Sequence, residues 1–176
     1  MRRPRVATCW LDGCSGCHMS LLDGDETVVE LLQRIDLVYG PLVDAQEFPQ
    51  DVDVALVEGA VGSQDDLRLA RQVRERSRVV VALGDCAVTS NIPSLRNGLP
   101  LRPLLERIYV DGVDARPGVP VQGVPALLRQ AVPLHQVIRV DVHVPGCPPR
   151  PATIAFVVRE LLAGRQPDLA GKVHFG

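Results

Sequence analysis

The sequence predicts an α/β fold built on a mainly parallel, doubly wound sheet. Short apolar runs alternate along the chain with segments of helical periodicity, which is typical of βαβ units. Glycine- or aspartate-containing turns close most of the apolar runs. The chain has 176 residues, 46% of them apolar, which is enough for a substantial buried core. We therefore expect a single domain over residues 1–176.

The first strand is predicted at residues 6–11 (VATCWL), because this short apolar run ends in an Asp-Gly turn. Residues 26–35 then carry apolar side chains at helical spacing, with acidic residues around their start, which favours a helix. The first cysteine pair, Cys14 and Cys17, is therefore expected in the turn between a strand and a helix.

Two further strands and a helix are predicted next. Residues 53–57 (DVALV) indicate the second strand. Ser63 and Asp66 match a capping box, which starts a helix that runs to about residue 77. Residues 78–83 (RVVVAL) form the most strand-like run in the chain.

The second half is less regular. Residues 100–133 predict one short helix and then a long irregular excursion punctuated by prolines. Such a loop is either functional or an ordinary surface meander, and the sequence leaves both open. Residues 137–144 (VIRVDVHV) alternate like a strand, and Pro151 starts a helix that ends near Gly164.

Charge and composition exclude several function classes. The formal net charge is −2, and no basic cluster marks a nucleic-acid surface. No apolar run approaches the roughly 20 residues of a membrane span, and the N-terminal Met-Arg-Arg-Pro lacks the apolar region of an export signal. We expect a cytoplasmic protein with no nucleic-acid or membrane partner. Five cysteines favour metal binding or redox chemistry over a disulfide framework.

Four of the cysteines lie just after predicted strands. Cys14 and Cys17 follow the first strand, Cys86 the third and Cys147 the fourth. Because the carboxyl ends of parallel strands meet at one edge of a sheet, we expect these four thiols to share a site. Cys9 lies inside its strand and is expected to be a bystander.

Four thiolates satisfy a [4Fe–4S] cluster and leave no open position for a substrate, which favours electron transfer over catalysis. Nearby glycines would let the backbone approach a cluster and aim N–H groups at its sulfurs, and prolines would stiffen the turn after Cys147. These residues are Gly13, Gly16, Gly84, Gly146, Pro148 and Pro149. Each glycine taken singly is equally well explained as an ordinary βα turn residue.

Two other uses of the cysteines stay open at this point. Four cysteines also bind structural zinc, which would make the chain an interaction module without a redox role. A thioredoxin-like pair at Cys14 and Cys17 is the other alternative, although it leaves Cys86 and Cys147 unused. Inert cysteines are expected in mid-strand or mid-helix rather than in Gly/Pro turns.

Three more residues near this edge are candidates. Glu58 ends the second strand and is either a proton-path or cluster-adjacent carboxylate, or a turn or cap residue. His18 follows Cys17 and either donates to a cluster sulfur or titrates near neutrality, or is an ordinary loop histidine. Trp10 is expected to pack in the core rather than against a partner or a flavin.

The cysteine motifs resemble those of the small, electron-transferring subunit of nickel–iron hydrogenases. They read GCSGCHMSLL (13–22), VEGAV (57–61), GDCA (84–87) and PGCPPRP (145–151). The resemblance implies a flavodoxin-like domain whose four cysteines hold the proximal [4Fe–4S] cluster. This ligand role maps onto Cys14, Cys17, Cys86 and Cys147. Nothing in the chain resembles the paired C-x-x-C nickel motifs of a large subunit, so no catalytic residue is expected here.

Two departures refine the resemblance. Larger small subunits continue into a domain with further clusters, whereas this sequence has no ligands left for them, so one cluster is expected. Related complex I subunits carry two adjacent cysteines in the first motif, whereas Ser15 and Gly16 separate the pair here. This spacing favours hydrogenase and leaves a complex I-like, quinone-linked subunit as the alternative.

The short form is similar to the small subunit of cytoplasmic NAD-reducing, bidirectional hydrogenases. There, the resemblance implies, a large subunit holds the Ni–Fe site, and diaphorase subunits carry FMN, the NAD site and further clusters. This chain is then a non-catalytic relay between them. FMN on this chain is a minor alternative, because no clear phosphate-cradling loop is evident and only 3% of the residues are aromatic.

Overall fold

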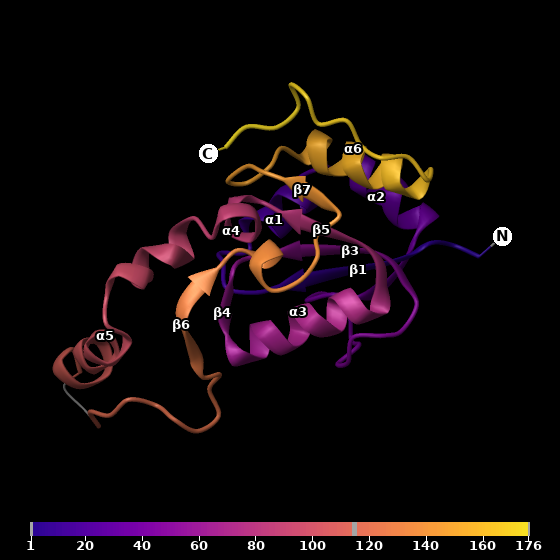
Figure 1. Cartoon of the computed structure of the whole chain (residues 1–176). Coiled ribbons are helices and arrows are strands. Elements are labelled where there is room, and N and C mark those ends of the chain that lie inside the picture. Colours follow the sequence, from indigo (N-terminus) through magenta and orange to yellow (C-terminus); the bar gives the residue numbers. More distant parts are fainter. Residues whose placement is uncertain (1, 114–115, 176) are drawn as a thin grey trace.

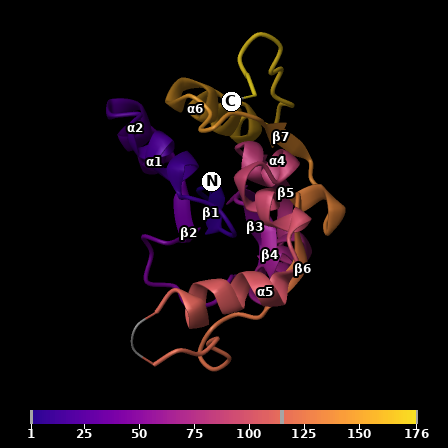
Figure 2. The same ribbon diagram turned by 90° about the vertical axis from the view of Figure 1, so that its left-hand side faces the viewer.

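The main sheet is fully parallel, with its strands in the order β2-β1-β3-β5-β7 (Figures 1 and 2). The computed structural model describes residues 2–113 and 116–175. The five strands are β1 (Arg5–Trp10), β2 (Asp36–Tyr39), β3 (Val52–Glu58), β5 (Ser77–Leu83) and β7 (Val142–Val144). Numbered along the chain within this sheet, their order is 2-1-3-4-5, the flavodoxin-like arrangement. The predicted fold class is confirmed.

Helices cover both faces of the sheet (Figure 1). Helix α3 (Gln64–Arg76) covers one face, and α2 (Glu26–Arg34) and α6 (Pro151–Leu162) cover the other. The other α-helices are α1 (Gly16–Leu22), α4 (Asp85–Thr89) and α5 (Leu101–Glu106). Strand side chains alternate between the faces. Ala55 and Val57 of β3 enter the core beneath α3, whereas Val54 and Leu56 enter the core beneath α2 and α6. In the ranges described, no helix is both long and apolar enough to cross a bilayer.

Two helix ends follow the sequence signals. The Asp66 amide donates to Ser63 Oγ at 3.1 Å, and the Ser63 amide donates to Asp66 Oδ2 at 2.8 Å, so the capping box of α3 is confirmed. Helix α6 begins at Pro151 as predicted. Gly164, with φ of +73°, lies just beyond its end, and its amide donates to the Leu161 carbonyl at 3.0 Å.

The last strand is shorter than predicted. Only Val142–Val144 of the segment 137–144 pairs with β5, and a 3-10 helix, η3 (Leu134–Gln136), precedes it. Asp141 explains the late start. Its Oδ2 accepts the Val80 amide at 2.8 Å, so a side chain occupies a donor that a longer strand would use.

Two short elements near the N-terminus were not predicted. Strand β2 follows α2 after one residue and lies at the sheet edge, where four residues give little periodicity. Helix α1 stands where the prediction placed a turn. Ser15, with φ of +68°, reverses the chain so that the helix starts between Cys14 and Cys17.

The excursion leaves the sheet and returns to it (Figures 1 and 2). A 3-10 helix, η1 (Ile92–Gly98), precedes the excursion, which contains α5, a π-helical turn, η2 (Arg107–Asp111), and β6 (Leu127–Val132). Strand β6 pairs antiparallel with β4 (Val61–Ser63), so the prediction of an irregular return is wrong there. The partner strand is three residues long and distant in sequence, which leaves no local signal. Residues 114 and 115 of the predicted excursion lie outside the described residues.

Candidate functional site

Three cysteine segments meet at the carboxyl edge of the sheet. The first (residues 13–18) follows β1, the second (84–87) follows β5, and the third (145–149) follows β7. Strand β3 lies between β1 and β5 and ends at Glu58. The structure therefore brings together the four cysteines that follow strands. Cys14 and Cys147 are exposed, and Cys17 and Cys86 are half-buried.

The four thiols lie within electrostatic reach of one another. Burial, reinforced by the charges of Cys147 and Cys14, raises the pKa of the Cys86 thiol to about 11. Burial also raises the pKa of the Cys17 thiol, followed by the charge of Glu58 and then by the other three cysteines. Ionising Cys17 and Cys86 is therefore unfavourable here without nearby cations. Metal ions supply that charge and bind thiols in the deprotonated form, so the donor set fits an iron–sulfur cluster.

Two of the predicted glycines lie against cysteine sulfurs. Gly84 has φ of +82° and ψ of 163°, and a β-carbon there would overlap Cys17 Sγ. A β-carbon on Gly16 would lie 3.2 Å from Cys14 Sγ. Substitution at either glycine would therefore push on a thiol.

The other two glycines lie against backbone. A β-carbon on Gly13 would lie 3.2 Å from the Cα atom of Gly59. Gly146 has φ of +140°, and a β-carbon there would lie 2.6 Å from the Cα atom of Pro149. These two positions shape the turns rather than the space around the sulfurs. The peptide bond between Cys147 and Pro148 is cis.

Glu58 and His18 form a buried pair beneath the first cysteine segment. Their exposed fractions are 3% and 6%. Glu58 Oε2 accepts the His18 backbone amide at 2.8 Å and lies 2.5 Å from His18 Nδ1. The carboxylate therefore caps the first turn of α1 and orients the imidazole with Nδ1 as donor. His18 Nε2 is buried and has no hydrogen-bond partner in the described part of the chain.

These contacts sharpen the sequence interpretation of both residues. His18 belongs to a helix and is buried, so it is not an ordinary loop histidine. The contacts of Glu58 match the cap interpretation, although the helix it caps starts in the cysteine segment.

The expectation that Trp10 packs in the core is wrong. Its side chain is 41% exposed and meets the His18 ring edge-on, with the ring centroids 5.4 Å apart. Trp10 also lines an apolar cavity of about 330 Å³ beside α1 and α2.

Sequence reasoning passed over Asp85. This carboxylate is 3% exposed, and its Oδ1 accepts the Gly146 amide at 2.6 Å, which joins the second and third cysteine segments. The available signal was an acidic residue between an apolar strand and a candidate ligand.

Cys9 lies in the core beneath α3, and burial raises the pKa of its thiol to about 12.

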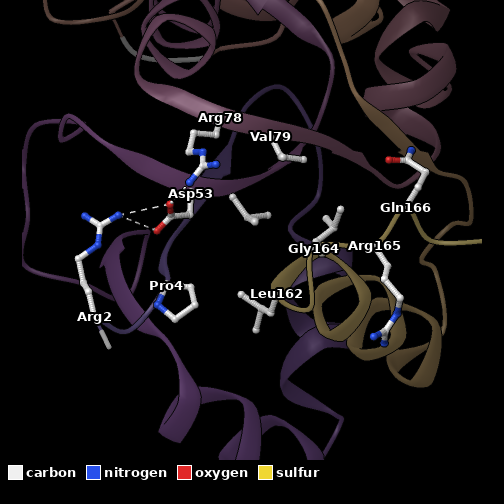
Figure 3. A pocket seen from close by; sticks show the side chains of 11 residues that line it. Arg2, Pro4, Asp53, Arg78, Val79, Leu162, Gly164, Arg165 and Gln166 are labelled. Carbon is white, nitrogen blue, oxygen red and sulfur yellow. Dashed lines mark hydrogen bonds and ion pairs between the residues drawn. The ribbon is translucent and has the colours of Figure 1, made fainter.

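Another pocket, of about 590 Å³, opens at the opposite edge of the sheet, where β3 and β5 begin (Figure 3). Its charges pair among themselves or with neighbours. Asp53 meets Arg2 at 3.2 Å and Arg78 at 3.4 Å, and Arg165 meets Glu160 at 2.6 Å.

Across the described residues, no three His, Cys, Asp or Glu side chains are placed to hold a single metal ion.

The fold and the sheet-edge cysteines define a class of flavodoxin-like α/β proteins with a cysteine-lined carboxyl edge. The family model of the NADH ubiquinone oxidoreductase 20 Kd subunit matches residues 14–161, and the chain belongs to this family. Among curated relatives, the delta subunit of the NAD-reducing hydrogenase HoxS of Cupriavidus necator is 34% identical over 175 residues, which cover 97% of this chain and 84% of that protein. These matches confirm the resemblance to NAD-reducing hydrogenases.

Other relatives are longer. A subunit of the vhu F420-non-reducing hydrogenase of Methanocaldococcus jannaschii is 38% identical over 171 residues, which cover 96% of this chain and 59% of that protein. The chain thus spans less than two thirds of several relatives that it matches.

Solved structures agree with these matches. The crystal structure of NAD⁺-reducing [NiFe]-hydrogenase in the H₂-reduced state superimposes with a TM-score of 0.94 at 34% identity, covering 99% of this chain and all of that one. The [NiFeSe] hydrogenase from Desulfovibrio vulgaris Hildenborough, at 19% identity and a TM-score of 0.56, covers 93% of this chain and 64% of its own, and shares the fold.

Proposed function

We propose that this chain is the electron-transfer subunit of an NAD-reducing nickel–iron hydrogenase. The observation that carries the proposal is the convergence of four thiols from three chain segments at one sheet edge. The similarity to the delta subunit of HoxS and to an NAD⁺-reducing [NiFe]-hydrogenase supports this choice among iron–sulfur proteins.

In this proposal Cys14, Cys17, Cys86 and Cys147 hold a single [4Fe–4S] cluster. The bound cluster supplies one-electron transfer between the Ni–Fe site of a large subunit and diaphorase subunits that carry FMN, the NAD site and further clusters. The chain contributes no catalytic residue. Its own residues position the thiols, since Glu58 fixes the start of α1 and Gly84 leaves room for the Cys17 sulfur. We place the complex in the cytoplasm, because its proposed acceptor is the soluble coenzyme NAD.

The test is Cys147→Ala in the assembled complex. Hydrogen-driven NAD reduction should be abolished, while NADH-driven dye reduction by the diaphorase subunits persists. Cys9→Ala is the matched control and should leave both activities intact, because the Cys9 side chain is buried in the core beneath α3. Intact hydrogen-driven activity in Cys147→Ala would disprove the relay role.

The family match favours one second candidate, a complex I-like, quinone-linked subunit, because the matched family carries the name of an NADH ubiquinone oxidoreductase subunit. The subunits that co-purify with the chain discriminate the two. A zinc-stabilised module is the third candidate by residue type alone, because no three described His, Cys, Asp or Glu side chains are placed around a single metal ion. Metal analysis and EPR after anaerobic purification separate it, because a reduced iron–sulfur protein gives a signal and a zinc protein is silent.

A further inference from the structure

Asp85 forms hydrogen bonds with both the amide and the carbonyl of Gly146, the residue that precedes Cys147. Its Oδ1 accepts the Gly146 amide at 2.6 Å, and its own amide donates to the Gly146 carbonyl at 2.9 Å. Asp85 itself directly precedes Cys86. Two cysteine segments that are distant in sequence are thus joined next to both thiols.

These bonds extend strand pairing beyond the ends of the strands. The register of β5 and β7 ends with Leu83 opposite Val144, and the Gly84 amide then donates to the Val144 carbonyl at 2.8 Å. The two hydrogen bonds between Asp85 and Gly146 come next, one residue beyond Gly84 and two residues beyond Val144. The bonding between the two strands therefore continues into the segments that follow them and ends next to Cys86 and Cys147.

The third cysteine segment depends on this extension. Strand β7 has only three residues and lies at the edge of the sheet, where it pairs with β5 alone. A strand this short holds the following loop weakly. Cys147 is exposed, so little packing fixes its thiol.

We propose that Asp85 is a positioning residue that holds Cys86 and Cys147 in place relative to each other before a cluster binds. The proposal rests on the proposed function in one respect, that these two cysteines are cluster ligands. Asp85 acts through the backbone of Gly146 and does not itself need to touch the cluster.

The test compares Asp85→Ala and Asp85→Asn in the full chain within its complex. Asp85→Ala removes the acceptor, so the Gly146 amide should exchange with solvent at least tenfold faster, and iron should be lost to a chelator at least tenfold faster. Asp85→Asn keeps an acceptor oxygen but makes a neutral, weaker bond. Its two rates should lie between those of the wild type and Asp85→Ala, and they carry the test if Asp85→Ala does not fold.

Asp141→Ala is the matched control. Asp141 Oδ2 accepts the Val80 amide at 2.8 Å, which joins the middle of β5 to the residue just before β7, away from the cysteines. This variant should lower thermal stability and leave iron loss unchanged. The proposal is overturned if exchange at Gly146 and iron loss stay at wild-type rates in both Asp85 variants, or if Asp141→Ala loses iron as fast as Asp85→Ala. A colourless, EPR-silent wild type would instead overturn the proposed function, and Gly146 exchange would still report on the Asp85 bond.

Discussion

The sulfur of Cys17 lies directly against the backbone of Gly84 and occupies the space that the β-carbon of any other residue would need. Gly84 follows β5 and Cys17 follows β1, and β3 separates these two strands in the sheet. A β-carbon on Gly84 would also lie 3.4 Å from the Gly146 carbonyl oxygen. All three cysteine segments therefore meet at this one glycine.

Gly84→Ala should displace the Cys17 thiol. The combination of φ +82° and ψ 163° is essentially restricted to glycine and costs another residue about 1–3 kcal/mol. The overlap with Cys17 Sγ adds to this cost. We expect a lower melting temperature and a reduced iron content per chain, measured by calorimetry and metal analysis.

Gly164→Ala separates the effect of backbone strain from the effect of the overlap with Cys17 Sγ. Gly164 also has a positive φ, +73°, but a β-carbon there meets no atom within 4 Å. It should lower stability by about 1 kcal/mol through backbone strain alone, with full iron content. Equal iron content in the two variants would show that the contact with Cys17 does not matter.

Glu58→Ala should loosen the start of α1. It leaves the buried His18 amide and Nδ1 without their acceptor, and each unsatisfied buried donor costs about 1–3 kcal/mol. Denaturant unfolding should show this loss, and hydrogen exchange should show faster exchange at the His18 amide. Glu58→Gln retains an acceptor oxygen and should recover most of the stability. If Gln and Ala destabilise equally, the carboxylate charge rather than the hydrogen bond stabilises the helix start.

The sequence predicted those parts of the fold that have a strong local pattern. Buried strands such as residues 78–83 show a continuous apolar run, and Ser63 and Asp66 mark the start of α3. Strands β4 and β6 could not be found in this way, because each depends on a partner strand that is distant in sequence. The end of β7 was predicted well, but its start was not, because the side chain of Asp141 occupies the Val80 amide.

The site divides along the same line. Placing cysteines after strands requires only the rule that parallel strands end at one edge. Pairing Glu58 with His18, or Asp85 with Gly146, depends on the order of the strands in the sheet and on side-chain direction. Local periodicity encodes neither the strand order nor the side-chain direction, so sequence patterns could not predict the hydrogen bonds that position the cysteine segments.

Ser63→Ala should destabilise the protein without affecting the cysteines. The variant removes the Oγ acceptor of the Asp66 amide, and loss of such a cap costs about 1 kcal/mol. Urea unfolding measures the loss, and Ser63→Thr should restore most of it because it keeps the hydroxyl. Iron content should equal that of the wild type in both. Reduced iron in Ser63→Ala would mean that α3 supports the cysteine edge in a way that its position does not suggest.

Cys9 should make the protein sensitive to alkali. Burial raises the pKa of its thiol from the ordinary 9.0 to about 12, so between these values the unfolded chain has lost a proton that the folded chain keeps. Folding stability is therefore intact below about pH 9 and falls as pH rises towards 12, by about 1.4 kcal/mol per unit from this group. Cys9→Ala removes the titrating thiol. Its unfolding free energy should decline less steeply between pH 9 and 11, measured by urea titration at each pH.

Val57→Ala is the control for the cavity that Cys9→Ala creates. Val57 lies opposite Cys9 in the pairing of β1 with β3 and is equally buried, but it cannot titrate. Its loss of stability should be the same at every pH, so its profile should run parallel to that of the wild type. If the Cys9→Ala profile also ran parallel, the Cys9 thiol would titrate alike in the folded and unfolded chains, and burial in the core beneath α3 would not protect it.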